Sequence, residues 1–114
     1  VTDYYMHKVV KVDLETNEAV NEFGGYGLAD GKLFLPFGIS ADKQENFILV
    51  GEAGNNRVTV LTRDFEFVKT IGQIGTLEDD FFFPSDIVPL KGNSGKYLIP
   101  NRISNKVEQV QIKL

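Results

Sequence analysis

The sequence predicts an all-β fold built from repeated units of four short antiparallel strands, and two observations support this. The chain resembles itself when it is shifted by 48 residues, since Gly24 then falls on Gly72 and Pro36 on Pro84. Glycine permits backbone conformations that other residues avoid, and proline restricts them. Because glycine falls on glycine and proline on proline, one local structure occurs twice. In addition, no apolar spacing near 3.6 residues persists over three turns, so we expect no helix.

Apolar positions also coincide in the repeat. Val10 falls on Val58, and Val12 falls on Val60, without a gap. After one inserted residue, Val58 falls in turn on Val107. We therefore interpret the whole chain as successive copies of one unit.

The complete copy contains four short runs in which β-branched and aromatic residues are frequent. These predicted strands are residues 37–41, 47–50, 57–62 and 65–71. The segments between them are rich in turn-forming residues. In the third strand, Val58 and Val60 point to one side of the sheet, and Thr59 and Leu61 point to the other.

Four antiparallel strands in each repeat are typical of a β-propeller blade. A blade cannot bury either of its faces alone, so it packs between neighbours in a closed ring of about four to eight blades. We therefore predict a propeller segment of about two and a half blades within one domain. Residues 1–30 are the end of one blade, residues 31–78 are a complete blade, and residues 79–114 are an incomplete one.

Three segments of the complete copy carry a resemblance to a known repeat family. They are residues 35–42 (LPFGISAD), 46–52 (NFILVGE) and 54–60 (GNNRVTV). These segments resemble NHL repeats, whose pattern contains Pro-x-Gly-Ile-Ala-x-Asp, Asn-x-Tyr-Val-x-Asp and Gly-Asn-x-Arg-Val. The resemblance implies a propeller of roughly six blades, within the usual range for closed rings. It also implies a role as a binding platform.

The later copies depart from the NHL pattern at two places. The aspartate after the second strand is present as Asp3, but it is replaced by Glu52 and Asn101 in the following copies. The Gly-Asn-x-Arg turn at residues 54–57 becomes Ile-Ser-Asn-Lys at residues 103–106. Because Gly and Asn tolerate positive φ, we expect this turn chiefly to join two strands.

Composition excludes several kinds of site. The chain has no cysteine, which excludes disulfides and thiolate ligands, and its single histidine, His7, cannot form a multi-histidine metal site. The net charge is −4, and no block of Lys and Arg occurs, so we expect no nucleic-acid partner. No apolar run approaches the roughly 18 residues of a membrane span. We predict no cofactor and no bound metal.

The first functional hypothesis is a non-catalytic scaffold that displays side chains on short, rigid turns. We expect the turns between the second and third strands and the linkers between blades to lie on one face of the ring. The candidate binding residues are Tyr4, Tyr5, His7, Tyr26, Leu28, Asn55, Arg57, Ile74 and Leu77. Asn55 and Arg57 have a second interpretation, in which they serve only the turn. The partner would be a protein, or other chains that complete the propeller.

A second hypothesis is a propeller enzyme whose active site needs further blades. Residues 1–9 resemble the corresponding stretch of peptidyl-amidoglycolate lyase, a family that implies a zinc ligand at His7. The lyase pattern also requires a histidine directly after a repeat-opening proline, but Pro36 is followed by Phe37 and Pro84 by Ser85. Catalytic zinc takes about three protein ligands, so a structural role in the turn is favoured for His7.

An RNA-binding NHL module is the third hypothesis, ranked last because the chain is acidic. The compartment stays open, although free-standing NHL propellers favour an extracytoplasmic or secreted location. Finally, two and a half blades leave two blade faces without a neighbour. Since exposed apolar faces and unpaired edges recruit other chains, we expect the segment to be part of a longer propeller or to close a ring with other chains.

Overall fold

The computed structural model describes residues 1–42, 44–72, 86–91, 95–101 and 106–114. Over these ranges the chain is all-β, with ten strands and no helix. The strands are β1 (Thr2–Asp3), β2 (Lys8–Asp13), β3 (Glu18–Gly24), β4 (Pro36–Ala41), β5 (Phe47–Glu52), β6 (Arg57–Thr62), β7 (Phe67–Ile71), β8 (Val88–Pro89), β9 (Lys96–Asn101) and β10 (Lys106–Gln111). In the part of the chain that is described, no helix has the length and apolar character needed to cross a membrane.

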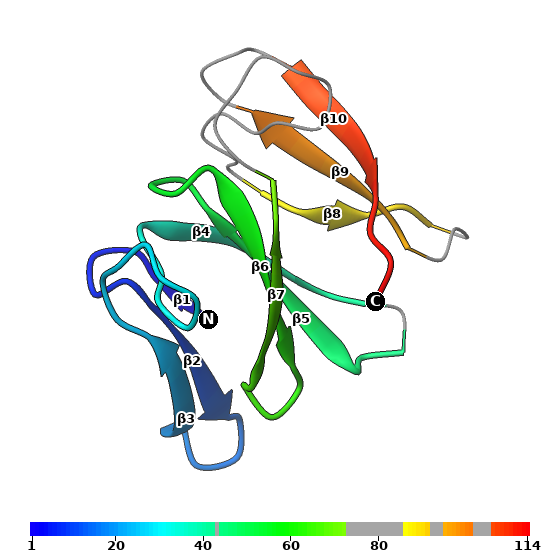
Figure 1. Ribbon diagram of the computed structural model, residues 1–114. Helices are drawn as coiled ribbons and strands as arrows, with labels where there is room; N and C mark the ends of the chain where they lie inside the picture. Colours follow the sequence, from blue (N-terminus) through cyan, green and yellow to red (C-terminus); the bar gives the residue numbers. More distant parts are fainter. Residues whose placement is uncertain (43, 73–85, 92–94, 102–105) are drawn as a thin grey trace.

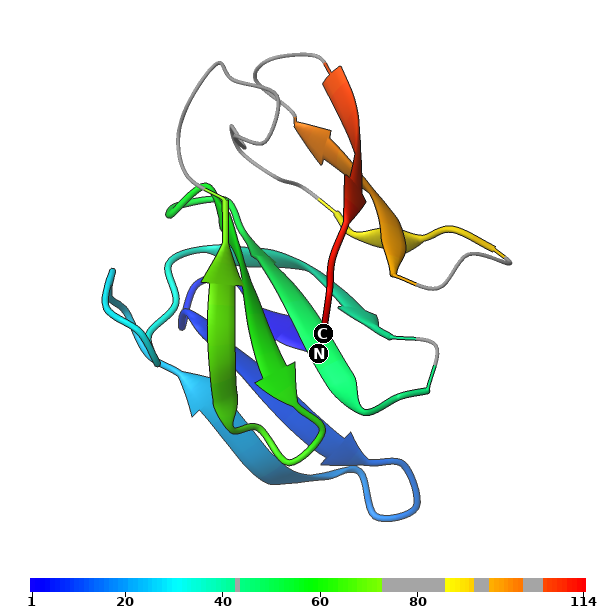
Figure 2. The same ribbon diagram turned by 45° about the vertical axis from the view of Figure 1, so that its right-hand side comes forward.

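The strands form three antiparallel sheets in which each strand pairs with the next along the chain. We call them the first sheet (β1–β3), the central sheet (β4–β7) and the third sheet (β8–β10). The central sheet lies between the other two (Figure 1), and the rotated view keeps this order (Figure 2). Successive antiparallel sheets of three to four strands are partial propeller blades, so the predicted fold class is confirmed.

The central sheet is the complete four-stranded unit that the sequence predicts. Its strands agree with the prediction to within two residues at each end. One of the two-residue differences is at the last strand, which begins at Phe67 and was expected to begin at Phe65. Phe65 instead has a positive φ of 66° in the turn before β7, and its amide donates to the carbonyl of Thr62 at 2.9 Å. Its ring is 9% exposed, so burial of the side chain fixes this turn.

The strand register corrects the alignment of the repeats. Asp3 pairs with Lys8 in the first sheet, and Glu52 pairs with Arg57 at the same place in the central sheet. Equivalent residues in this region are therefore 49 positions apart rather than 48.

It follows that Val9, and not Val10, is the counterpart of Val58, and the ungapped alignment is wrong for these strands. Val9 and Val58 are both fully buried, as equivalent positions should be. The offset returns to 48 after the hairpin loop of the first sheet, because that loop has one extra residue. Asp13 pairs with Glu18 there, whereas Thr62 bonds to Glu66 in the central sheet.

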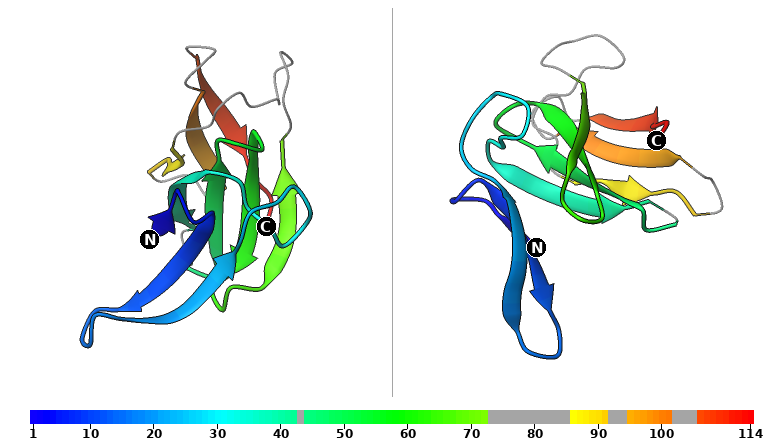
Figure 3. Two further views of the ribbon diagram at one scale, coloured as in Figure 1. Left: turned by 90° about the vertical axis from the view of Figure 1, so that its left-hand side faces the viewer. Right: turned by 60° about the horizontal axis from the view of Figure 1, so that its bottom comes forward.

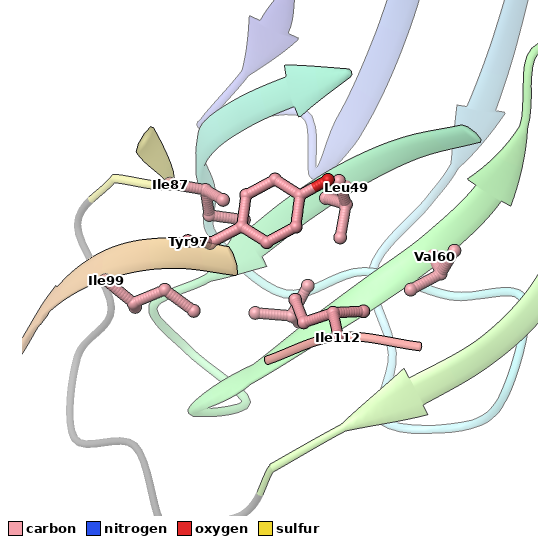
Figure 4. Close-up of a cluster of buried hydrophobic side chains, with 7 residues drawn as sticks. Leu49, Val60, Ile87, Tyr97, Ile99 and Ile112 are labelled. Atoms are coloured by element: carbon pink, nitrogen blue, oxygen red, sulfur yellow. The ribbon is translucent and has the colours of Figure 1, made fainter. Parts of the chain in front are cut away.

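Two apolar clusters join the central sheet to its neighbours. The first junction, towards the first sheet, contains Val9, Leu33, Val50, Leu61 and Phe65, with Phe23 and Ile48 packed against them. The second junction, towards the third sheet, contains Leu49, Val58, Val60, Ile87, Tyr97, Ile99 and Ile112 (Figure 4). Burial of about 25 cal/mol per Å² of apolar surface makes these clusters the main stabilising contacts of the fold.

The hairpin of β2 and β3 extends beyond the rest of the molecule (Figure 3). Most of β3 is exposed, and Leu14 and Val20 leave 88% and 57% of their surface accessible. The apolar interior is thus concentrated around the central sheet, where both faces are covered.

Candidate functional site

The turn between β5 and β6 is built around a buried carboxylate. The side chain of Glu52 is completely inaccessible, and it accepts hydrogen bonds from the amide of Phe34 at 3.1 Å and from Asn55 Nδ2 at 2.8 Å. Arg57 Nε donates to Glu52 Oε2 at 2.8 Å, and the hydroxyl of Thr59 donates to the same oxygen. Burial of a charged group is costly unless it is paired and hydrogen-bonded. The four donors therefore offset the cost of burying this carboxylate.

Arg57 and Asn55 also hold the linker that enters the central sheet. The guanidinium of Arg57 donates to the carbonyls of Leu28 at 2.9 Å and Lys32 at 3.0 Å, and Asn55 Nδ2 donates to the carbonyl of Gly27 at 3.0 Å. The planar fork of arginine suits several acceptors at once. These two residues therefore do more than shape their own turn, because they fix the linker between the first two sheets.

His7 occupies the equivalent turn of the first sheet. It has a positive φ of 56°, matching the 51° of Asn56 in the central sheet. Its Nδ1 accepts a hydrogen bond from the amide of Leu35 at 3.0 Å, and its carbonyl accepts one from Gly25 at 2.8 Å. His7 thus connects the first sheet to both ends of the linker, which is the structural role favoured from the sequence.

Aromatic rings gather around His7. The ring of Tyr26 lies 5.3 Å from His7 and 5.0 Å from Phe34, and Phe34 lies 5.5 Å from His7, between ring centroids. Gly54 makes room for Phe34, since a Cβ at this position would come within 2.4 Å of the ring. The close contact requires glycine at residue 54 and sets the position of the three rings.

A second group of rings includes Tyr4 and Tyr5, which belong to the same turn between β1 and β2 as His7. Tyr4 packs edge-on against Tyr5 at 5.2 Å and against Phe37 at 5.4 Å, between ring centroids. Asp3 stabilises the turn, because its Oδ1 accepts the amide of Met6 at 3.1 Å. Residues 4–7 and 34–37 consequently carry aromatic side chains at one end of the first junction.

We call these side chains the rim cluster: Tyr4, Tyr5, His7, Tyr26, Phe34 and Phe37. Three of its rings are exposed, with 84% of Tyr5, 66% of Tyr26 and 44% of Phe37 accessible. The neighbouring Met6 and Leu28 are 61% and 68% exposed. Aromatic and methionine side chains in such numbers on a surface are characteristic of contact sites.

The structure brings together most of the candidate residues. His7 meets Tyr26, and Asn55 and Arg57 bind the linker that carries Leu28. Ile74 and Leu77 lie outside the described residues.

The candidate binding residues predicted from the sequence did not include Glu52, Phe34 or Phe37. Glu52 could have been identified by its position, because it is an acidic residue at the end of the second strand, five residues before Arg57. The signal for Phe34 and Phe37 was their place on either side of Pro36, but only the fold shows which rings meet.

A hollow of about 530 Å³ lies between the central and third sheets, away from the rim cluster. It is lined by Asp42, Glu45, Lys91, Lys96 and Tyr97, among others. Burial, and secondarily the negative charge of Asp42, raises the pKa of the Tyr97 phenol above its ordinary value of 10.0. Across the described ranges, no three His, Cys, Asp or Glu side chains are grouped as metal ligands.

Comparison with known proteins gives one distant relative. The chain is 25% identical to Protein brain tumor of Drosophila melanogaster, an NHL-repeat protein, over 91 residues. The match covers 80% of this chain but 8% of the relative's length. No protein-family model matches the chain. The similarity supports the NHL resemblance and, as the broad class of function, a scaffold that interacts with protein or RNA.

Proposed function

We propose that this chain is a non-catalytic, NHL-type scaffold that binds a protein partner through the rim cluster. The proposal includes its division into three blades of one propeller domain, residues 1–30, 31–78 and 79–114. Each of these ranges contains one of the three sheets. The distant similarity to an NHL-repeat protein supports the family assignment.

The observation that carries the proposal is the exposure of aromatic rings on an immobilised backbone. Tyr5 and Tyr26 are mostly accessible, yet the segments that carry them are held by the hydrogen bonds of Asp3, His7 and Arg57. Binding to a rigid surface loses less conformational entropy than binding to a mobile one. Exposed tyrosines on a rigid turn are therefore suited to act as anchors for a partner.

Charge favours protein over RNA as the partner. The chain has 16 acidic and 12 basic side chains. Around the rim cluster, the guanidinium of Arg57 is occupied by Glu52 and by linker carbonyls, so it does not offer a free cation to phosphate. RNA affinity depends largely on neutralising phosphates, and the acidic balance of the chain disfavours such binding.

Site-specific photocrosslinking tests the proposal. A photoreactive phenylalanine analogue at position 5 should crosslink to a protein in cells, whereas the same group at Leu14, which is 88% exposed on the distant hairpin loop, should not. For the protein so identified, Tyr5→Ala should raise Kd at least about tenfold, as expected for loss of an aromatic anchor. Leu14→Ala should leave Kd within about twofold, the range of a neutral surface change.

Tyr5 suits this test because its only ring contact among the described residues is with Tyr4, so its loss should leave the fold intact. Equal crosslinking at positions 5 and 14 would contradict the proposal. Crosslinking of position 5 to RNA in place of protein would contradict it as well.

A further inference from the structure

The hollow between the central and third sheets is lined by charges of both signs, one sign from each sheet. Its volume of about 530 Å³ is within the usual range of small-molecule sites. Asp42 and Glu45, between β4 and β5, contribute carboxylates from the central sheet. Lys91, after β8, and Lys96, the first residue of β9, contribute ammonium groups from the third sheet. The hollow therefore offers a carboxylate side and an ammonium side to a ligand.

Within the described part of the chain, none of these four charged groups has a counter-ion. The ion pairs that the described residues form lie elsewhere, in the first sheet and in the turn between β5 and β6. Asp42 accepts one hydrogen bond, from the amide of Phe47 to its Oδ1 at 2.8 Å, and this bond fixes the carboxylate at the end of β4. The charges that line the hollow are thus available to charged groups of a ligand.

The hollow also has an apolar lining. Ala41, Pro89 and Leu90 border it, together with Tyr97. Tyr97 is only 2% exposed, and its ring reaches from β9 towards Leu49 in the second junction (Figure 4). Packing therefore holds this residue in place. Small-molecule sites typically combine apolar surface with a few fixed polar groups, as this hollow does.

We propose that the hollow binds a small zwitterion with an apolar side chain, which is either a free amino acid or a short peptide. Its ammonium group contacts Asp42 and Glu45, and its carboxylate contacts Lys91 and Lys96. Its side chain packs on the apolar lining. A ligand of one charge would meet like charge on one side of the hollow, so a simple anion or cation fits less well.

This site is separate from the rim cluster and goes beyond the function proposed above. The rim cluster includes Phe37 near the start of β4, whereas the hollow lies at the other end of that strand (Figure 1). The two sites can therefore be tested independently.

An NMR titration of the isotope-labelled 114-residue chain gives the first test. The probes are L-leucine, a free amino acid, and leucyl-leucine, a short peptide. At least one of them should shift the backbone amide signals of Ala41, Leu90 and Tyr97, with a Kd of about 1 mM or tighter. The tighter of the two probes identifies the source of the zwitterion. No shift of these signals with either probe at about 20 mM, well above that Kd, would overturn the proposal.

Blocked forms of the tighter probe test the need for both charges. The C-terminal amide lacks the carboxylate, and the N-acetyl form lacks the ammonium group. Each should bind with a Kd at least about tenfold higher, because one side of the hollow then has no opposite charge to contact. Blocked forms that bind as tightly as the zwitterion would contradict the proposal.

A pair of lysine variants tests the position of the carboxylate. Lys96→Gln should raise the Kd of the zwitterion about threefold or more, as expected for loss of a partly exposed ion pair. Lys106→Gln is the matched control, since Lys106 is exposed on the same sheet but does not line the hollow, and it should leave the Kd unchanged. Equal effects of the two variants would overturn the assignment. None of these results would bear on the rim cluster, which crosslinking at position 5 tests.

Discussion

The two junctions of the central sheet differ in the contacts that their described residues make. At the second junction, the described contacts are mainly apolar, with Ile99 and Tyr97 packed against Leu49. At the first junction, a smaller apolar cluster is combined with the buried Glu52–Arg57 pair. At the first junction, apolar residues thus join the sheet faces, whereas the polar turn residues join the central sheet to the linker before it.

A comparison between equivalent turns supports this conclusion. Asp3 and Lys8 occupy in the first sheet the places of Glu52 and Arg57. Lys8 instead pairs with Glu22 at 3.0 Å, and both side chains remain partly or largely exposed. The Glu52–Arg57 pair is therefore buried beneath the linker, whereas the Lys8–Glu22 pair lies at a more exposed place.

The largest expected effect is the loss of the buried carboxylate. Glu52→Ala should lower the free energy of unfolding by about 3–5 kcal/mol, because it leaves Arg57 buried without its counter-ion. Urea denaturation at a fixed chain concentration measures this, since self-association would make stability depend on concentration.

Glu22→Ala is the matched control for that experiment. It removes a glutamate from the exposed pair with Lys8, and it should cost about 0.5 kcal/mol or less. Equal losses for the two variants would contradict the contrast drawn between the buried and exposed pairs.

A smaller effect is expected at the second junction. Ile99 is fully buried there, and Ile99→Val removes one methylene from the apolar cluster. The variant should lower the free energy of unfolding by about 0.5–1.5 kcal/mol, the usual cost of this substitution in a core. Ile39→Val, at a residue that is 36% exposed, is the control and should cost less. A cost of Ile99→Val as large as that of Glu52→Ala would contradict the expected order of these two effects.

The third effect is confined to alkaline pH. Because the pKa of Tyr97 is raised in the folded protein, its contribution to stability is fully present below about pH 10 and is lost as pH rises through the folded value. The unfolding free energy of the unmodified chain should therefore fall more steeply above pH 10 than that of Tyr97→Phe. Tyr5→Phe, which retains Tyr97, should show the steeper fall. Identical alkaline profiles for the unmodified chain and Tyr97→Phe would refute this prediction.

The sequence was sufficient to predict the all-β fold and the complete central sheet, because the repeat marks turns by Gly, Pro and Asn. It misplaced the repeats by one residue at Val9, since an ungapped shift cannot detect an extra residue in a hairpin loop. Strand register depends on pairing between strands, and alternation alone fits either Val9 or Val10 on the buried side.

The candidate site was predictable in part. His7 and Asn55 lie in turns between second and third strands, as the turn signals indicated, whereas Arg57 is the first residue of the third strand, β6. What these residues bind could not be predicted, because their acceptors and donors belong to linker residues about 25 to 29 positions away. Such contacts depend on how the linker folds back over the turn, which no local pattern specifies.

The linker is held through its main chain, and this has a consequence for sequence variation. Arg57 and Asn55 bind the carbonyl oxygens of residues 27, 28 and 32, which every amino acid provides. The side chain of Leu28, 68% exposed, takes no part in those bonds. Replacement of this side chain should thus leave the scaffold unchanged while altering the surface that it presents. A library varied at position 28, and at the exposed Tyr5 and Met6, would diversify recognition without a loss of foldability, much as antibody loops do on their framework.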